Sequence, residues 1–414
     1  MKLRNLLFAT MFACAFASCS SDDDPTIDPT PAEAADAYLD ITVNTKTVGT
    51  KANVDTEGDY AREGESNINN LTIAVFNADN NDALIGYQRV ESEGFTKKGE
   101  GASATYKFNS PVKTKAVKVK VYVLANVPAN NAIATAKDLS GYEAAVSLLS
   151  DQSITGLTMS SALLTSDGAL KDAKIAPESN PNKMGEGSSV DNAVTGCTGD
   201  ILLQRVAARV QMGKVFSSKY TKKEKLVITG VYMFNVRSDA KLLGAGTLDY
   251  KTGTQLFQAS APFEGDLKVK DENLTEDNTS LSVKYENGIT IDANTDSENK
   301  QTLTDAVFYT MPNALLSKDT KGNKAYTLIS VKGTYTSPEG VTMTGDRWYT
   351  VLVGKEGAGN DGDVVVRNTV YDIQTLDITG SGSDNPYTPQ AAAYLNAQVK
   401  VAPWSYVVQT PSVD

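Results

Sequence analysis

Only a few residues of this 414-residue sequence have side chains and spacings that could support chemistry, because it contains no histidine. The absence excludes Ser-His-Asp and Cys-His catalysis, histidine general bases and histidine-ligated metal sites. Carboxylate-only glycoside hydrolysis stays open, but nothing in the sequence places two of the 50 Asp and Glu residues across a cleft. We therefore expect no enzymatic activity, no catalytic residue and no cofactor.

The three cysteines divide into two groups. Cys14 and Cys19 lie in the first twenty residues, and Cys197 is the only cysteine in the rest of the chain. No disulfide and no cysteine-cluster metal site can therefore form within the body of the protein. We expect Cys197 to be a small buried apolar residue rather than a reactive thiol.

The N-terminus has the pattern of an export signal. Basic residues in the first four positions precede an apolar stretch, residues 6–17, that is too short to span a bilayer. Small residues then precede Cys19, as in a bacterial lipoprotein box, where the cysteine thiol is acylated before the signal is cut. We expect a signal peptide at 1–18, a lipid on Cys19, and an acidic, Pro-rich tether through residue 31 that resembles surface-export signals of Bacteroidetes lipoproteins.

A protease site is expected after the first strand. Residues 37–48 alternate as a strand does, and the Gly-, Thr- and Asp-rich stretch that follows should be exposed. A trypsin-like enzyme cutting after Lys51 would separate the lipid and this strand from the rest of the chain. Arg62 is the alternative site, and an exposed loop that is never cut is the competing interpretation.

Two distant segments of the chain share a pattern. Residues 37–43 read AYLDITV, and residues 393–404 read AYLNAQVKVAPW, with Ala, Tyr, Leu and Val matched in one register. Each alternates apolar and polar residues, which is typical of a strand with one buried face. Both segments could therefore fill the same groove.

The body of the chain is predicted to be β-rich. Strands are expected at 71–76, 104–108, 116–127, 226–236, 306–309, 325–335, 348–353 and 369–378, joined by polar turns. One helix is predicted at 138–149 with Asp138 or Ser140 as N-cap, and 166–200 reads as a long loop. For 201–216 the pattern does not decide between helix and strand. Few helices and many short strands favour antiparallel sandwiches.

Composition limits the partners. The net charge of −11 argues against nucleic acid, because phosphate binding needs a basic surface. The length suits two domains. Acidic insertions at 271–278 and 292–299 could hold calcium, but neither has the EF-hand spacing, so solvated loops are the preferred interpretation and no metal site is predicted.

The chain resembles the fimbrillins, the pilus subunits of Bacteroidales. The resemblance is carried by the lipoprotein box with the first strand and the basic cut site, and by four further runs: LTIAVFN at 71–77, QRVAAR at 204–209, VFYTMPN at 307–313 and RNTVYDI at 367–373. Lysine at the cut site departs from the arginine that is commoner in the family.

The resemblance implies two transthyretin-like antiparallel β-sandwich domains, at 52–200 and 201–414, preceded by a removable segment at 19–51. It also implies head-to-tail assembly at the cell surface after an outer-membrane lipoprotein precursor is cut by a trypsin-like protease. Other subunits would be the main partners, with a host or bacterial surface ligand in addition. The removable strand would use Leu39, Ile41 and Val43, and the donor strand Leu395, Ala397, Val399 and Val401.

A second function fits the same residues. The chain could be a tip adhesin or a glycan-binding surface lipoprotein that stays anchored through Cys19. The two functions differ in whether the mature surface protein still carries its lipid.

Overall fold

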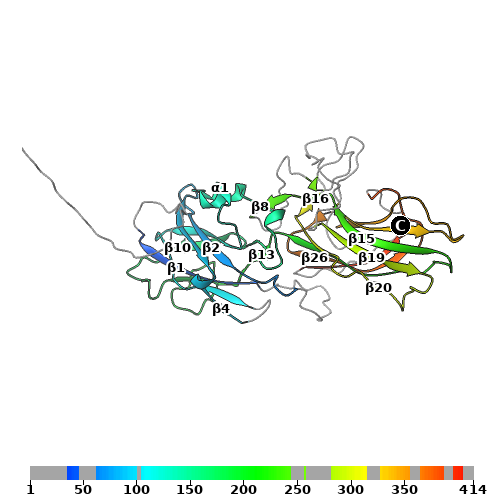
Figure 1. Ribbon diagram of the computed structural model, residues 1–414. Helices are drawn as coiled ribbons and strands as arrows, with labels where there is room; N and C mark the ends of the chain where they lie inside the picture. Colours follow the sequence, from blue (N-terminus) through cyan, green and yellow to red (C-terminus); the bar gives the residue numbers. More distant parts are fainter. Residues whose placement is uncertain are drawn as a thin grey trace, which may run out of the picture.

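A computed structural model describes residues 35–45, 62–99, 104–243, 256–257, 281–314, 327–354, 364–386 and 395–403. Within this part of the chain nearly all regular structure is β-strand, and the strands form two β-rich lobes that lie side by side (Figure 1). The helical elements described are α1 (Leu139–Ala144) and the 3-10 turns η1 (Ser92–Gly94), η3 (Ala132–Ala134) and η4 (Leu149–Asp151).

Two sheets form the first lobe. In one, the order is β11-β1-β5-β4, and β6 and β12 also pair with β1. These strands are β1 (Ala37–Asn44), β4 (Phe95–Lys98), β5 (Thr105–Phe108), β6 (Val112–Thr114), β11 (Asn182–Met184) and β12 (Ile201–Leu202). In the other, the order is β13-β9-β7-β2-β3, and β10 pairs with β7. Its strands are β2 (Asn70–Asn77), β3 (Leu84–Glu91), β7 (Lys118–Ala125), β9 (Met159–Ser160), β10 (Leu164–Ala169) and β13 (Gln204–Arg205).

The second lobe also has two main sheets. One has the order β20-β14-β26-β27, with β21 on β14, and the other has the order β19-β15-β23-β24. The first contains β14 (Ala208–Phe216), β20 (Gln301–Thr302), β21 (Val307–Thr310), β26 (Thr369–Ile378) and β27 (Leu395–Pro403). The second contains β15 (Lys225–Phe234), β19 (Ser282–Asp292), β23 (Thr327–Thr336) and β24 (Arg347–Val353).

Three short pairs complete the described strands. They are β16 (Val236–Arg237) with β18 (Leu256–Phe257), β17 (Asp239–Lys241) with β8 (Val146–Leu148), and β22 (Asn313–Ala314) with β25 (Val364–Val365). The pair of β8 and β17 links segments from the two halves of the sequence.

Hydrophobic clusters fill the two lobes and join them. One fills the space between the first two sheets and draws almost entirely on residues up to Leu203. Another, from Ala208 onward, fills the second lobe. A third lies under α1 and combines side chains of the first lobe with Leu242, Leu243 and Met311. The third cluster therefore ties the second half of the chain to the outer face of the first lobe.

The prediction of a nearly all-β chain is confirmed, but the sheets are mixed rather than purely antiparallel. Strand β1 runs parallel to β11 and β12, and β14 runs parallel to β26 from Arg209 to Phe216. Long connections between these partners make parallel pairing possible, whereas short hairpins would have enforced antiparallel pairing.

The predicted helix at 138–149 is wrong in its length. The Asp138 carboxylate caps the helix by accepting a hydrogen bond from the Gly141 N–H at 2.9 Å, as expected for this N-cap candidate. The backbone becomes extended at Ala145, however, and residues 146–148 pair with β17. Pairing across the two halves therefore overrides the weak helical preference of this segment.

The structure also shows which secondary structure forms at 201–216 and at 166–200. Residues 201–216 form strands β12, β13 and β14 rather than a helix. The predicted loop at 166–200 is mostly irregular, but it also holds the end of β10 and all of β11, which pairs with β1.

Cys197 lies in the core of the first lobe. Its side chain is 3% exposed. Burial, with a smaller contribution from Asp167, raises the pKa of the thiol to about 11. Because the thiolate is the reactive form, Cys197 should be inert at neutral pH.

We predict that Cys197 is alkylated by iodoacetamide roughly 100-fold more slowly in the folded chain than in urea, because a thiol pKa of about 11 instead of 9.0 depletes the thiolate by that factor. The measurement uses a chain with Cys14 and Cys19 replaced by serine, followed by mass spectrometry. A variant with Ser189→Cys, at an exposed position, should label rapidly in the folded state. Equal labelling rates at both sites would contradict the prediction.

Candidate functional site

Strand β1 occupies the middle of its sheet. On one side it pairs in parallel with β11 and β12, where Leu39 is opposite Asn182 and Val43 is opposite Ile201. On the other side it pairs antiparallel with β5 and β6. Both backbone edges of β1 are therefore hydrogen-bonded, and its loss would leave an open groove between two sets of strands.

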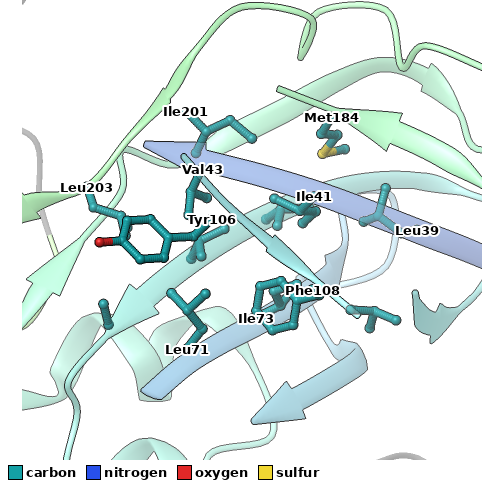
Figure 2. Close-up of a cluster of buried hydrophobic side chains, with 14 of the residues drawn as sticks. Leu39, Ile41, Val43, Leu71, Ile73, Tyr106, Phe108, Met184, Ile201 and Leu203 are labelled. Atoms are coloured by element: carbon teal, nitrogen blue, oxygen red, sulfur yellow. The ribbon is translucent and has the colours of Figure 1, made fainter. Parts of the chain in front are cut away.

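The apolar face of β1 closes the core of the first lobe. Ala37, Leu39, Ile41 and Val43 are each 0% exposed. Figure 2 shows the last three lying over Ile73 and Phe108, in the cluster that also contains Leu71, Tyr106, Met184, Ile201 and Leu203. Burying such aliphatic side chains contributes roughly 1.5–3 kcal/mol each, so the groove strongly favours an apolar occupant.

The opposite face of β1 carries a charged cluster. Lys107 Nζ lies 2.8 Å from Asp40 Oδ2 and 2.6 Å from Glu186 Oε1, and the Thr42 hydroxyl donates to the same Glu186 oxygen at 2.9 Å. Burial raises the pKa of Asp40 despite the opposing effect of Lys107. For Glu186, the hydrogen bonds from Lys107 and Thr42 outweigh burial and lower its pKa.

Gly185 brings this acidic residue close to β1. Its φ is +81°, and a Cβ placed there would lie 2.1 Å from the Thr42 carbonyl oxygen. Only glycine accepts that conformation and that approach without strain. Glu186 is therefore held against the strand by backbone geometry.

The predicted removable residues and the predicted donor residues are not brought together within one chain. Leu39, Ile41 and Val43 lie in the first lobe, whereas Leu395, Ala397, Val399 and Val401 lie in β27 of the second lobe. Strand β27 pairs antiparallel with β26 of its own chain, at the end of the strand order described for that sheet. The register of this pair shifts between Ile373 and Thr375, where β26 has one extra residue. The residues of β27 are therefore paired without a gap.

Of the residues predicted for processing, only Arg62 can be placed. Cys19 and Lys51 lie outside the described residues. Arg62 is exposed, and its backbone N–H donates to Glu65 Oε2 at 2.7 Å.

Glu65 forms a buried link between the lobes. Its side chain is 0% exposed and meets Arg209 Nη1 of β14 at 2.5 Å and the Tyr309 hydroxyl of β21 at 2.7 Å. The Arg205 guanidinium donates to the Glu65 carbonyl oxygen at 3.1 Å. Burial beside this carboxylate raises the pKa of Tyr309, so the phenol remains a donor. A buried carboxylate loses its contacts with water, and the arginine and the phenol replace them.

Arg367 adds further hydrogen bonds at the same junction. Its guanidinium donates to the Arg205 carbonyl oxygen at 3.3 Å and to the Ser160 hydroxyl at 2.9 Å. Burial lowers its pKa to about 10, which leaves it charged at neutral pH.

Sequence reasoning missed the role of Glu65. The signal was present in QRVAAR, where two arginines lie in an apolar strand and so require a buried anion. Nothing in a single sequence says that the anion comes from residue 65, which is 144 positions away from Arg209.

Neither a metal site nor a membrane helix is seen in the described ranges. They contain no group of three or more Cys, Asp and Glu residues suited to a cation. They also contain no helix that is long and apolar enough to cross a bilayer. The insertion at 271–278 lies outside the described residues, while in 292–299 the Asp292 and Asp296 carboxylates accept hydrogen bonds from neighbouring backbone N–H groups.

Both a known family and a known protein match this chain. Residues 37–203, which make up most of the first lobe, match the family described as Major fimbrial subunit protein (FimA). Over its full length the chain is 28% identical to the proposed fimbrium tip subunit Fim1C of Parabacteroides distasonis, of which it covers 99%.

Solved structures of similar proteins share the fold of this chain. The crystal structure of a proposed cell adhesion protein from Parabacteroides distasonis superposes with a TM-score of 0.64 at 25% identity, covering 91% of this chain and 99% of the other. That of a fimbrilin (fimA) from Porphyromonas gingivalis gives 0.58 at 19% identity, with 91% and 99% covered, and shares the fold. The resemblance to the Bacteroidales fimbrillins is thus confirmed, and residues 37–203 carry the family's own sequence pattern.

We predict that Glu65→Gln destabilises the chain by about 3–5 kcal/mol, because it leaves the buried Arg209 guanidinium without its carboxylate. Urea unfolding followed by circular dichroism measures the loss. Glu63→Gln, two residues away and exposed, is the matched control and should change stability by no more than about 0.5 kcal/mol. Equal unfolding midpoints for the two variants would show that the link is not structural.

Proposed function

We propose that this chain is a structural subunit of cell-surface fimbriae that serve adhesion and colonisation. The observation that carries the proposal is the position of β1, an interior strand at the N-terminal end of the described chain whose apolar face is wholly buried. The similarity to fimbrial subunits and adhesion proteins supports the same function. Those relatives are described as structural or adhesive proteins.

The first step of the proposed route is export as an outer-membrane lipoprotein. Residues 1–18 would direct export, and Cys19 would carry the lipid. The apolar stretch that ends in small residues before Cys19 supports this step.

The second step is a trypsin-like cut that frees β1. We favour Lys51 over Arg62 as the cut site. The backbone beyond Arg62 forms a turn in which the Glu65 N–H donates to the Arg62 carbonyl oxygen at 3.1 Å, and Glu65 itself is buried. Hydrogen-bonded backbone next to a buried side chain is a poor protease substrate.

The third step is strand exchange. A second copy would donate β27 into the groove that β1 leaves, so that backbone hydrogen bonds supply affinity and the alternating side chains supply specificity. Because donor and groove are different surfaces, the contact is head-to-tail and produces a filament. Strand β27 would first have to leave β26, and its place at the end of the described strand order favours that release.

The domain organisation is part of the same proposal. We place transthyretin-like sandwiches at 52–200 and 201–414, after a signal at 1–18 and a removable segment at 19–51. The change of hydrophobic cluster between Leu203 and Ala208 supports a boundary there.

A second candidate is a tip subunit or anchored adhesin. The similarity to a proposed tip subunit over the whole chain favours it. A tip subunit would receive a donor strand without passing its own to a neighbour, and an anchored adhesin would keep Cys19 and its lipid. Mass spectrometry of the N-terminus of the surface protein separates the anchored form from the cut form.

We predict that a chain truncated after Ala392 forms no polymer, because it has no strand to donate. Electron microscopy of cells and laddering on denaturing gels measure assembly. A chain that ends at Trp404 retains all of β27 and should assemble normally. Normal filaments from the shorter chain would exclude β27 as the donor.

We predict that Cys19→Ser abolishes incorporation of labelled palmitate and removes the precursor from the outer-membrane fraction, since the thiol is the acylated group. Cys14→Ser changes a cysteine inside the apolar stretch and should have no effect. Palmitate labelling of the Cys19→Ser chain would show that the lipid is attached elsewhere.

A further inference from the structure

The two AYL segments differ mainly in their polar residues. Aligned on Ala, Tyr and Leu, the C-terminal segment has Asn396 for Asp40, Gln398 for Thr42, Lys400 for Asn44 and Val401 for Thr45. The polar face of β1 is where the groove presents its charged cluster.

The first difference changes the charge of that cluster. With β1 in place, Asp40, Lys107 and Glu186 lie within contact distance and sum to −1. Asparagine at the position of Asp40 would leave Lys107 and Glu186 as a neutral pair. The raised pKa of Asp40 shows that burial disfavours a charged carboxylate at this position. An amide of the same shape avoids that cost.

The other polar differences also favour the C-terminal segment, whereas Ala397 in place of Ile41 buries a smaller side chain and favours β1. Thr42 offers Glu186 one hydroxyl donor at 2.9 Å, and glutamine at the same position would offer two amide donors. Asn44 Oδ1 and the Thr45 hydroxyl are buried and meet no hydrogen-bond partner among the described residues. Valine has the shape of threonine without its hydroxyl, and a lysine side chain is long enough to bring its ammonium to water.

We propose that the Lys107–Glu186 pair is a specificity determinant of the groove, which prefers the neutral Asn396 of a second copy's C-terminal strand over Asp40 of its own β1. The proposal rests on the strand exchange proposed above. It assigns to these two side chains a discrimination between self and donor strand that acts on the polar face, where β1 is the weaker match.

Covalent attachment explains how β1 is retained before processing although its polar face is the weaker match. While β1 belongs to the same chain, its binding to the groove is intramolecular, and linked segments of this kind typically have effective concentrations on the order of millimolar. Cutting removes that advantage, and the intrinsic preference of the groove then decides which strand is bound. Proteolysis and charge discrimination together give the exchange its direction.

The test uses the full chain with a site-specific protease sequence inserted between Lys51 and Ala52, cut so that β1 stays bound without a covalent link. A fluorescent peptide of residues 393–404, in excess, competes with β1, and anisotropy reports its uptake. We expect the natural peptide to bind roughly 5- to 10-fold more tightly than an N396D peptide at low ionic strength. In 1 M salt the ratio should fall towards one, because these side chains are only partly buried.

Glu186→Gln supplies the decisive variant. Without the Glu186 charge, Lys107 is left with no anion in the cluster when asparagine is present, so the preference should vanish or reverse in favour of the N396D peptide. Glu178→Gln, an exposed acid nearby in sequence, is the matched control and should leave the ratio unchanged.

The outcomes separate the two proposals. Uptake of both peptides with equal affinity overturns the specificity role of Lys107 and Glu186 while leaving strand exchange intact. A preference for the natural peptide that survives Glu186→Gln overturns it as well. Uptake of neither peptide overturns strand exchange into this groove, and the specificity role with it.

Discussion

The pairing of β1 along both of its edges is the constraint on which the first lobe depends. A strand in that position supplies hydrogen-bond partners to β11 and β12 on one side and to β5 and β6 on the other, while its apolar residues close the core. Its departure would expose unpaired backbone groups along two edges and an apolar wall between them. The first lobe therefore needs a strand in the position of β1, and this requirement fits the strand exchange proposed above.

The link between the lobes lies outside the segment that the proposed cut would remove. Glu65 follows both Lys51 and Arg62 in the sequence, so its contacts with Arg209 and Tyr309 remain in the chain after either cut. Only a cut after Arg62 would remove one donor to the Glu65 carboxylate. Strand β1 and the interlobe link therefore belong to separate parts of the structure, so the proposed replacement of β1 would leave the lobes joined.

Alternating apolar residues made most strands predictable, including β2, β7 and β26, because their core faces are continuous. The pattern failed where distant pairing decides the local structure. Residues 146–148 were predicted as helix, yet they pair with β17. Strand β11 lies in a segment that was predicted as a loop, and it is a strand because it pairs with β1. Short segments of weak intrinsic preference adopt whichever structure their partners offer.

For the candidate site, the sequence by itself determined the kind of residues present: the absence of histidine, the lipoprotein-like Cys19, the basic residues after the first strand and the two matching AYL segments. These are properties of composition and local order. Only the tertiary structure decided that β1 is an interior strand, that Glu65 meets Arg209, and that Lys107 and Glu186 face Asp40. Each of these contacts joins residues far apart in the chain, and charge pairing between such residues depends on distances that no single sequence contains.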